Sequence, residues 1–254
     1  MDLRKKIIII VGFFLILSVG AVIIVIKTFD RIEDQLLAKC EMEARIGARV
    51  VRNIMQMMIH TGRLTREQLM DPAYVEIPGS NPKKYHTKYD MVFDATMQKF
   101  EDEYLNDHDV IFAIAIDRNG YVPTHNSKYS RPPEKDPVKN MIYSRSKRNF
   151  ADKQEIKEIL RHRGEGTVRY LYQRDTGELV WNIGAPITIG GQHWGAFLIG
   201  ISLHRISIIK NQMFIITLTI MIVVLSFTLL IILAVIPQKF LAQKPESRSG
   251  PPQG

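Results

Sequence analysis

The sequence predicts an α+β domain held between two membrane-spanning helices. Three observations lead to this prediction: an uncharged apolar run near each end of the chain, a long helical pattern directly after the first run, and five strand-like segments farther on. Strands joined mostly by short turns favour one five-stranded antiparallel sheet, with helices on one face. Residues 27–210, between the runs, are enough for one folded domain.

The two apolar runs cover residues 7–26 and 211–236. Each is long enough, at about 1.5 Å rise per residue, to cross a hydrocarbon core about 30 Å thick. A cleaved signal peptide is the alternative for the first run, but its apolar part exceeds the usual length and no small-residue cleavage site follows it. We expect residues 1–6 and 237–254 to be cytoplasmic, the latter as a disordered tail rich in Pro, Gly and Ser.

The chain carries a net charge of +8, from 34 Lys and Arg against 26 Asp and Glu. An excess of this kind is also found in nucleic-acid-binding proteins. Here, however, half of it lies in basic clusters beside the apolar runs, where the positive-inside rule places the cytoplasmic side. We therefore expect both termini in the cytoplasm, residues 27–210 outside it, and no nucleic-acid partner.

Residues 28–60 are predicted to form one long helix that continues from the first span. Apolar residues follow interrupted heptad-like steps at Phe29, Ile32, Leu36, Ile46, Val50 and Met57. Such a seam favours a helix shared between a homodimer partner and its own domain; the alternative is a core helix of a monomer. Cys40, the single cysteine, either cross-links two chains or is an unpaired thiol.

A loop rich in turn residues separates this helix from a second one, predicted over residues 89–104. After this helix, the spacing of the apolar residues changes from that of a helix to that of a strand. Residues 110–116 form an apolar run, and the following Asn119-Gly120 is typical of a tight hairpin that leads into a second strand at Tyr121.

Residues 132–163 are charged, and a short helix is predicted near residues 152–161. The last three strands are predicted at 167–174, 178–188 and 193–203. Short turns with Gly connect them, so we expect them to be neighbours in the sheet.

These segments resemble a known family. The two spans, the long helix, the stretch FAIAIDRNGYVPTHN and the ending WGAFLIGISL look like the extracytoplasmic sensor region of bacterial methyl-accepting chemotaxis receptors, of the PAS-like, single Cache type. GYVPTHNSKYSRP and SRSKRNFAD are similar to segments of one subgroup. The resemblance covers roughly residues 1–236 and implies a chemoreceptor-like sensor in the bacterial inner membrane that binds a small molecule.

The chain departs from that family in two respects. No HAMP linker or cytoplasmic coiled coil follows the second span, so a signal is expected to pass through a cytoplasmic or membrane partner. The C-x-x-C-H motif of some haem-binding sensors is also missing, which excludes covalent haem. Non-covalent haem held by His125 is the remaining cofactor alternative.

In a PAS-like sheet the second strand and the connector after it border the ligand cavity, and the resemblance places residues 121–148 there. Tyr121 and His125 are expected on one face of the strand and Asn126 on the other. His125 and Asn126 are candidates for orienting a small polar ligand, with a structural role as the alternative. Tyr129 lies where the chain leaves the sheet, and it either contacts the ligand or shapes a loop.

Arg145 and Arg148 have planar donor forks that suit a carboxylate, which favours an anionic metabolite as ligand. A solvated basic loop near lipid headgroups is the alternative. Tyr170 and Tyr172 share one face of a strand and are placed to close the pocket, although core packing explains such residues equally well.

The sequence offers no sign of catalysis. Its seven histidines lack metal-ligand spacing, and no hydrolase or nucleotide-binding motif occurs. We therefore expect neither an enzyme nor a metal site. The alternative function is a structural or regulatory membrane subunit that uses the PAS-like domain as a protein-protein interface.

Overall fold

The computed structural model describes residues 3–71 and 73–235, which divide into two units. The helical unit contains the described residues up to Arg31 and those from Lys210 onward. The sheet unit is Ile32–Ile209. The expected tail at 237–254 lies outside the described residues.

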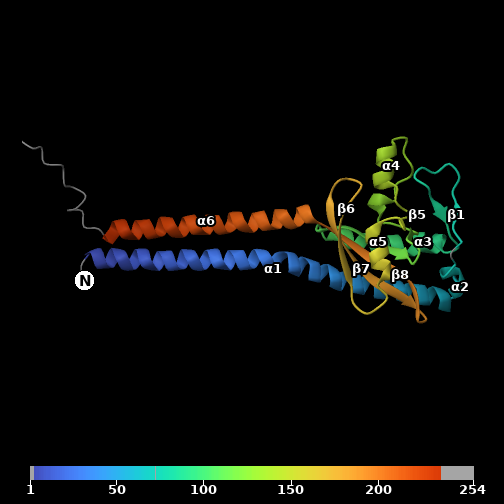
Figure 1. The fold of residues 1–254 in the computed structure, drawn as a ribbon, viewed down its shortest axis with the longest axis horizontal. Coiled ribbons are helices and arrows are strands. Elements are labelled where there is room, and N and C mark those ends of the chain that lie inside the picture. The colour runs from blue at the N-terminus through green and yellow to red at the C-terminus, as the bar shows by residue number, and fades with distance from the viewer. Residues whose placement is uncertain (1–2, 72, 236–254) are drawn as a thin grey trace, which may run out of the picture. The chain divides into compact units, whose positions relative to one another are not determined.

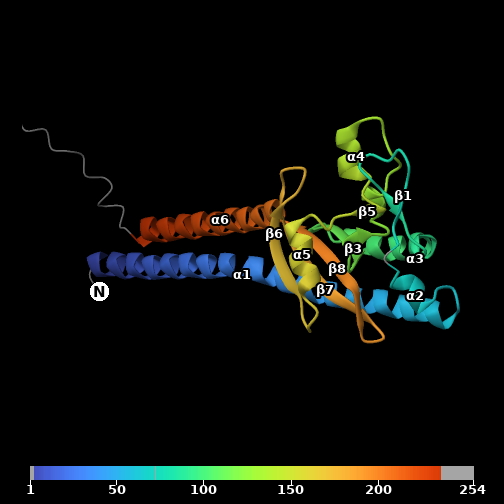
Figure 2. The same cartoon turned by 45° about the vertical axis from the view of Figure 1, so that its right-hand side comes forward.

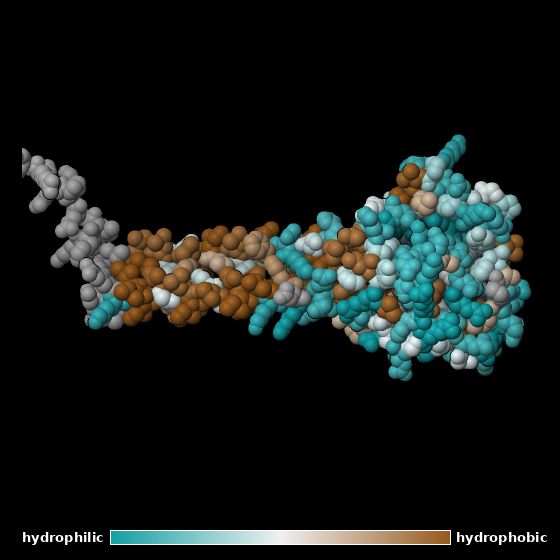
Figure 3. All heavy atoms as spheres, in the orientation of Figure 1, coloured by the Kyte–Doolittle hydropathy of each residue, from teal (hydrophilic) through white to brown (hydrophobic). Residues whose placement is uncertain are grey.

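The helical unit consists of one part each of α1 (Leu3–His60) and α6 (Leu203–Val235), which lie side by side in both views (Figures 1 and 2). Both helices are long and apolar enough to cross a membrane, as predicted. Apolar side chains cover their visible surface (Figure 3), and Ile16 and Phe227 are 72% and 64% exposed. Such a surface fits a lipid environment rather than water.

The sheet unit is built on a four-stranded antiparallel sheet in the order β3-β8-β7-β6. Its strands are β3 (Val110–Asp117), β6 (Val168–Gln173), β7 (Leu179–Ile189) and β8 (Gln192–Ser202). Each agrees with a predicted strand to within about one residue at either end. The three C-terminal strands are neighbours, as expected.

The fifth predicted strand does not join this sheet. The Asn119-Gly120 turn forms, with a φ of +82° at Gly120, but β4 (Tyr121–Val122) pairs with β5 (Arg148–Asn149) in a separate two-stranded sheet. Pro123 follows directly, and proline has no N–H to donate to a strand partner. The strand therefore ends after two residues, and the five-stranded prediction was wrong.

Side chains take the place of the missing strand along the open edge of β3. Asn126 Oδ1 accepts the N–H of Ala113 at 2.9 Å, and Glu101 Oε1 accepts the N–H of Ala115 at 2.9 Å. Asn126 Nδ2 in turn donates to the carbonyl of Glu101 at 2.7 Å. We call Asn126 and Glu101 the edge caps, because they satisfy backbone donors that a buried strand edge would otherwise leave unpaired.

One face of the sheet packs on α1 and on α3 (Asp90–Glu103), as predicted for 28–60 and 89–104. The buried side chains of α1 recur every three or four residues at Leu37, Cys40, Ala44, Ala48, Val51, Met55 and Met58. Burial raises the pKa of the Cys40 thiol to about 12, so it is neither exposed nor reactive enough to cross-link two chains.

The other face is covered too, by α5 (Gln154–Arg161) and by residues 121–150. The prediction that helices cover only one face was wrong. The reason lies in β8, where both faces are apolar and every residue from Trp194 to Ser202 is buried. A strand of this kind needs partners on both sides.

The remaining elements were not predicted: α2 (Arg66–Leu69), β1 (Val75–Glu76), β2 (Tyr85–His86), the 3-10 turns η1 (Tyr104–Asn106) and η2 (Ser127–Tyr129), and α4 (Pro137–Tyr143). Among them α4 has a recognisable start. Asp136 accepts the N–H groups of Val138 and Lys139, and Pro137 occupies the first helical position.

Candidate functional site

A small cavity of about 90 Å³ lies on the second face of the sheet. Its apolar wall is formed by Phe112, Ile114, Ile116, Val122, Phe150, Ile156 and Leu198. Its polar lining consists of His125, Arg145, Lys153, Glu155, Tyr172, Gln173, Arg174, Asp175 and Asn182. An apolar wall with a few converging polar groups is the usual form of a small-molecule site.

Two buried arginines line this cavity. Arg145 is 9% exposed, and its Nη2 donates to Asp175 Oδ2 at 2.8 Å. Arg174 is 7% exposed; its Nη1 lies 3.9 Å from Glu178 Oε2, and its guanidinium lies over the ring of Tyr129. Burial, and then the charge of Arg174, lower the pKa of Arg145. The two positive charges are thus close and only partly compensated.

His125 lies between aromatic rings beside these arginines. Its ring centroid is 5.0 Å from that of Tyr129 and 6.1 Å from that of Phe112. Burial, followed by the charges of Arg145 and Arg174, holds the pKa of His125 well below its usual range. The imidazole is therefore neutral at pH 7, with one nitrogen able to donate and the other able to accept.

Three buried polar atoms around the cavity have no hydrogen-bond partner within the described part of the chain: His125 Nδ1, Arg174 Nε and Asn182 Oδ1. Leaving such an atom unpaired costs about 1–3 kcal/mol, and most buried polar atoms in proteins are paired. Three of them at one cavity indicate a place for a polar ligand.

The structure brings three of the predicted site residues, His125, Arg145 and Tyr172, to this cavity. Tyr129 packs behind His125. Arg148 donates to the carbonyl of Met141 at 3.1 Å and lines a neighbouring hollow. Burial, and then the charge of Arg145, lower the pKa of Arg148 to about 10. Tyr170 is half-buried on the same face of β6 as Tyr172, outside the lining.

Tyr121 and Asn126 lie elsewhere. The Tyr121 hydroxyl is 2.8 Å from Asp90 Oδ2 and its ring belongs to the core beneath the other face of the sheet. Asn126 is an edge cap with both ends of its amide already bonded. The expectation that Tyr121 and His125 share a strand face was wrong, because the strand ends before Pro123.

Sequence reasoning missed Arg174, Asp175 and Asn182. Arg174 was predicted as the last residue of a strand and Asp175 only as part of a connection, whereas both belong to the turn between β6 and β7. Asn182 could have been recognised from the sequence, because it is a polar residue within an apolar strand. The structure shows that it is only 1% exposed. Pairing of β7 with β6 places Asn182 opposite Tyr170.

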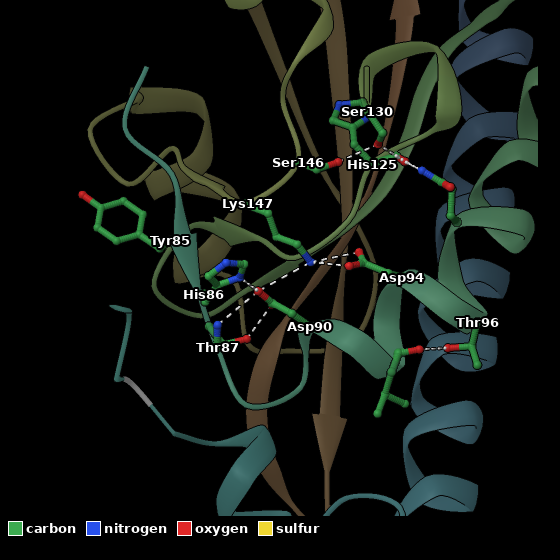
Figure 4. A network of polar contacts seen from close by, with 12 residues as sticks. Tyr85, His86, Thr87, Asp90, Asp94, Thr96, His125, Ser130, Ser146 and Lys147 are labelled. Atoms are coloured by element: carbon green, nitrogen blue, oxygen red, sulfur yellow. Dashed lines mark hydrogen bonds and ion pairs between the residues drawn. The ribbon is translucent and has the colours of Figure 1, made fainter. Parts of the chain in front are cut away.

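Ser146 and Lys147, which follow Arg145 in the chain, are fixed by contacts on two sides (Figure 4). Ser130 Oγ donates to the carbonyl of His125 at 2.7 Å, so the Ser146 hydroxyl, 2.5 Å away, donates to Ser130. Lys147 Nζ lies 2.8 Å from Asp94 Oδ2 and 3.5 Å from Asp90 Oδ2. Arg145 is therefore held between the His125 segment and α3.

Lys147 has a φ of +67°, so its backbone is strained while its ammonium group is paired. We expect Lys147→Ala to lower the free energy of unfolding by about 3 kcal/mol, since it keeps the strain and loses the ion pairs. Lys147→Gly should be about 1 kcal/mol more stable than Lys147→Ala, because glycine adopts this φ freely. Urea unfolding followed by tryptophan fluorescence measures both.

The matched control is Lys88→Ala, which removes an exposed lysine 2.8 Å from Asp71. Exposed pairs contribute little to stability. A Lys147→Ala variant as stable as Lys88→Ala would contradict the role given to Lys147.

No protein-family model matches the chain, and no curated protein matches it. Among solved structures, the sensor domain of the V. cholerae histidine kinase DctB is similar over 71% of this chain and 55% of that chain, with 13% identity and a TM-score of 0.41. The ligand-binding domain of Mlp24 with asparagine is similar over 70% of this chain and 61% of that chain, with 13% identity and a TM-score of 0.33. The chain thus spans less than two thirds of either structure, and the comparisons place it in no named family.

Proposed function

We propose that the chain is a membrane-anchored, chemoreceptor-like sensor of the PAS-like or Cache type, whose sheet unit lies outside the cytoplasm and binds a small anionic ligand. The observation that carries this proposal is the set of three unpaired buried atoms, on His125, Arg174 and Asn182, beside the buried guanidinium groups. The apolar spans predicted at 7–26 and 211–236 support the membrane location.

The lining sets the chemistry of the ligand. Arg145 and Arg174 favour a carboxylate, because charge-assisted hydrogen bonds to a guanidinium are the strong ones. Asn182 Oδ1 accepts a hydrogen bond, so the ligand also carries an N–H or O–H group. Neutral His125 serves either as donor or as acceptor. A small amino acid or hydroxy acid has these groups.

Binding would act on the strands that hold these residues. β8 crosses the sheet between β3 and β7 and ends at Ser202, and α6 begins at Leu203. A ligand shifts the helices only as far as its affinity differs between two arrangements of the sheet. The signal would then pass to a cytoplasmic or membrane partner. Exposed Ile46 and Met57 on α1 support a homodimer seam.

Thermal-shift screening of the full chain in a nonionic detergent, against amino acids and small organic acids, tests the proposal. A ligand at about 100 times its Kd adds roughly 2.7 kcal/mol of stability. We expect Arg174→Gln and Arg145→Gln to bind such a ligand about ten to a hundred times more weakly. Binding should show no step from protonation of His125 near pH 6.5, because burial and the neighbouring arginines lower the pKa of its imidazole well below that value.

Arg161→Gln is the control, since this exposed arginine pairs with Glu158 outside the cavity. Absence of any stabilising compound in a broad panel, or equal stabilisation of the wild type and of Arg174→Gln, would count against the site. The same preparation tests the haem alternative, which predicts a Soret band in protein from haem-replete cells.

A further inference from the structure

A second concave surface lies between α1, the loop that joins α5 to β6, and the end of β7. We call it the arginine groove; its walls carry Arg45, Arg49 and Arg52 of α1, Arg163 of the loop, and residues 185–188 of β7. It shares no lining residue with the cavity at His125.

The arginines of α1 are not explained by the stability of the helix. Arg45, Arg49 and Arg52 follow one another at four and three residues, which places them on one face of α1, where like charges repel. Within residues 3–71 and 73–235, the side chains of these three and of Arg163 form no ion pair or hydrogen bond, although the charge of Arg45 acts on nearby Glu41. Glu165 is the one acidic residue of the lining, and Glu41, one turn before Arg45, is paired with Arg169 at 2.6 Å.

The length of the arginine row favours more than one anionic group. Seven residues of helix separate the backbone of Arg45 from that of Arg52, a rise of about 10 Å, and a single carboxylate or phosphate is smaller than that. Four arginines against one glutamate call for about three negative charges, which two phosphate groups supply, since each carries roughly 1.5 to 2 charges at pH 7.

The edge of β7 argues against a peptide strand as the occupant. β6 begins at Val168, opposite Gly184, so residues 185–188 extend past it, but Pro186 has no N–H for a new strand. A second copy of the chain is disfavoured as well, because a two-fold contact through this groove would set arginines against arginines. Arginine forks, in contrast, match phosphate oxygens directly.

We propose that the arginine groove binds an anion with two or more phosphate groups, independently of the ligand in the cavity at His125. The phosphates come either from a free oligophosphate or from a lipid headgroup. In both cases Arg49 and Arg52 hold one phosphate group from α1, and Arg163 holds the next from the opposite wall.

Isothermal titration of the full chain in a nonionic detergent, with orthophosphate, pyrophosphate and tripolyphosphate, tests the proposal. We expect affinity to rise about tenfold with each added phosphate group, and tripolyphosphate binding to weaken about tenfold in each of Arg49→Gln, Arg52→Gln and Arg163→Gln. Arg63→Gln, at an exposed arginine outside the groove, is the matched control and should bind as the wild type does.

Several results would overturn the proposal: equal affinity for the three phosphates, an Arg63→Gln variant weakened as much as the groove variants, or citrate bound as tightly as tripolyphosphate. Two further arms identify the source. Chain in zwitterionic nanodiscs that binds tripolyphosphate indicates a free anion. Binding only to vesicles that contain cardiolipin, with its two phosphates, and loss of it in Arg49→Gln, indicates a headgroup.

Discussion

Replacing Asn126 by alanine is expected to lower the free energy of unfolding by about 3 kcal/mol. The change leaves the buried N–H of Ala113 without a partner, which costs about 1–3 kcal/mol, and it removes one of two hydrogen bonds to the carbonyl of Glu101, which keeps the backbone N–H of Tyr104. Urea unfolding followed by the fluorescence of buried Trp194 measures the loss. Hydrogen exchange at the Ala113 amide should become faster in the same variant.

The control is Asn53→Ala, at an exposed asparagine of α1, which should leave stability unchanged or slightly higher because alanine favours the helix. If Asn126→Ala were as stable as this control, Asn126 would not be the cap of β3. Ligand binding by Asn126, which the resemblance suggested, would then be the better explanation of this residue.

The second large effect is expected at Glu101, the other edge cap. Glu101 is fully buried, and burial raises the pKa of its carboxyl well above 4.5. The folded state therefore binds a proton that the unfolded state releases, so the contribution of Glu101 is complete below pH 4.5 and is lost as the pH rises toward the raised pKa. The loss is about 1.4 kcal/mol per pH unit in that window.

Glu101→Gln should remove this pH dependence. Glutamine keeps an oxygen for the N–H of Ala115 and does not ionise, so its stability relative to the wild type should grow steadily above pH 4.5. Urea unfolding at a series of pH values gives the two slopes. Glu103→Gln, exposed on the same helix, is the control and should track the wild type; parallel slopes for all three proteins would exclude a buried ionising group at 101.

The secondary structure was predictable where the periodic pattern of apolar residues extends over many positions. The apolar and helical periods located α1, α3, β3 and the three C-terminal strands to within a few residues. Pairing after Asn119-Gly120 was not predictable, because it depends on contacts that no local pattern shows: Asn126 and Glu101 occupy the edge of β3 that a hairpin partner would use. Strands of two residues, such as β4 and β5, have no period to detect.

The candidate site was predictable in part for a related reason. His125 and Arg145 stand out by residue type within one connector. Arg174 and Asn182 reach the same cavity from a turn and a strand that follow much later in the chain, and only the strand register brings them there. The lowered pKa of His125 among buried arginines was not predictable either, because its main cause is burial, which the sequence does not show.

The edge caps also affect how readily the protein aggregates when many copies lie close together. A bare outer strand offers a row of free amides to which another polypeptide can add, the usual first step toward fibrous aggregates. In this molecule Asn126 and Glu101 already occupy two of those amides on β3. A neighbouring molecule therefore cannot add a strand at these two amides of β3, which hinders strand-by-strand polymerisation along this edge.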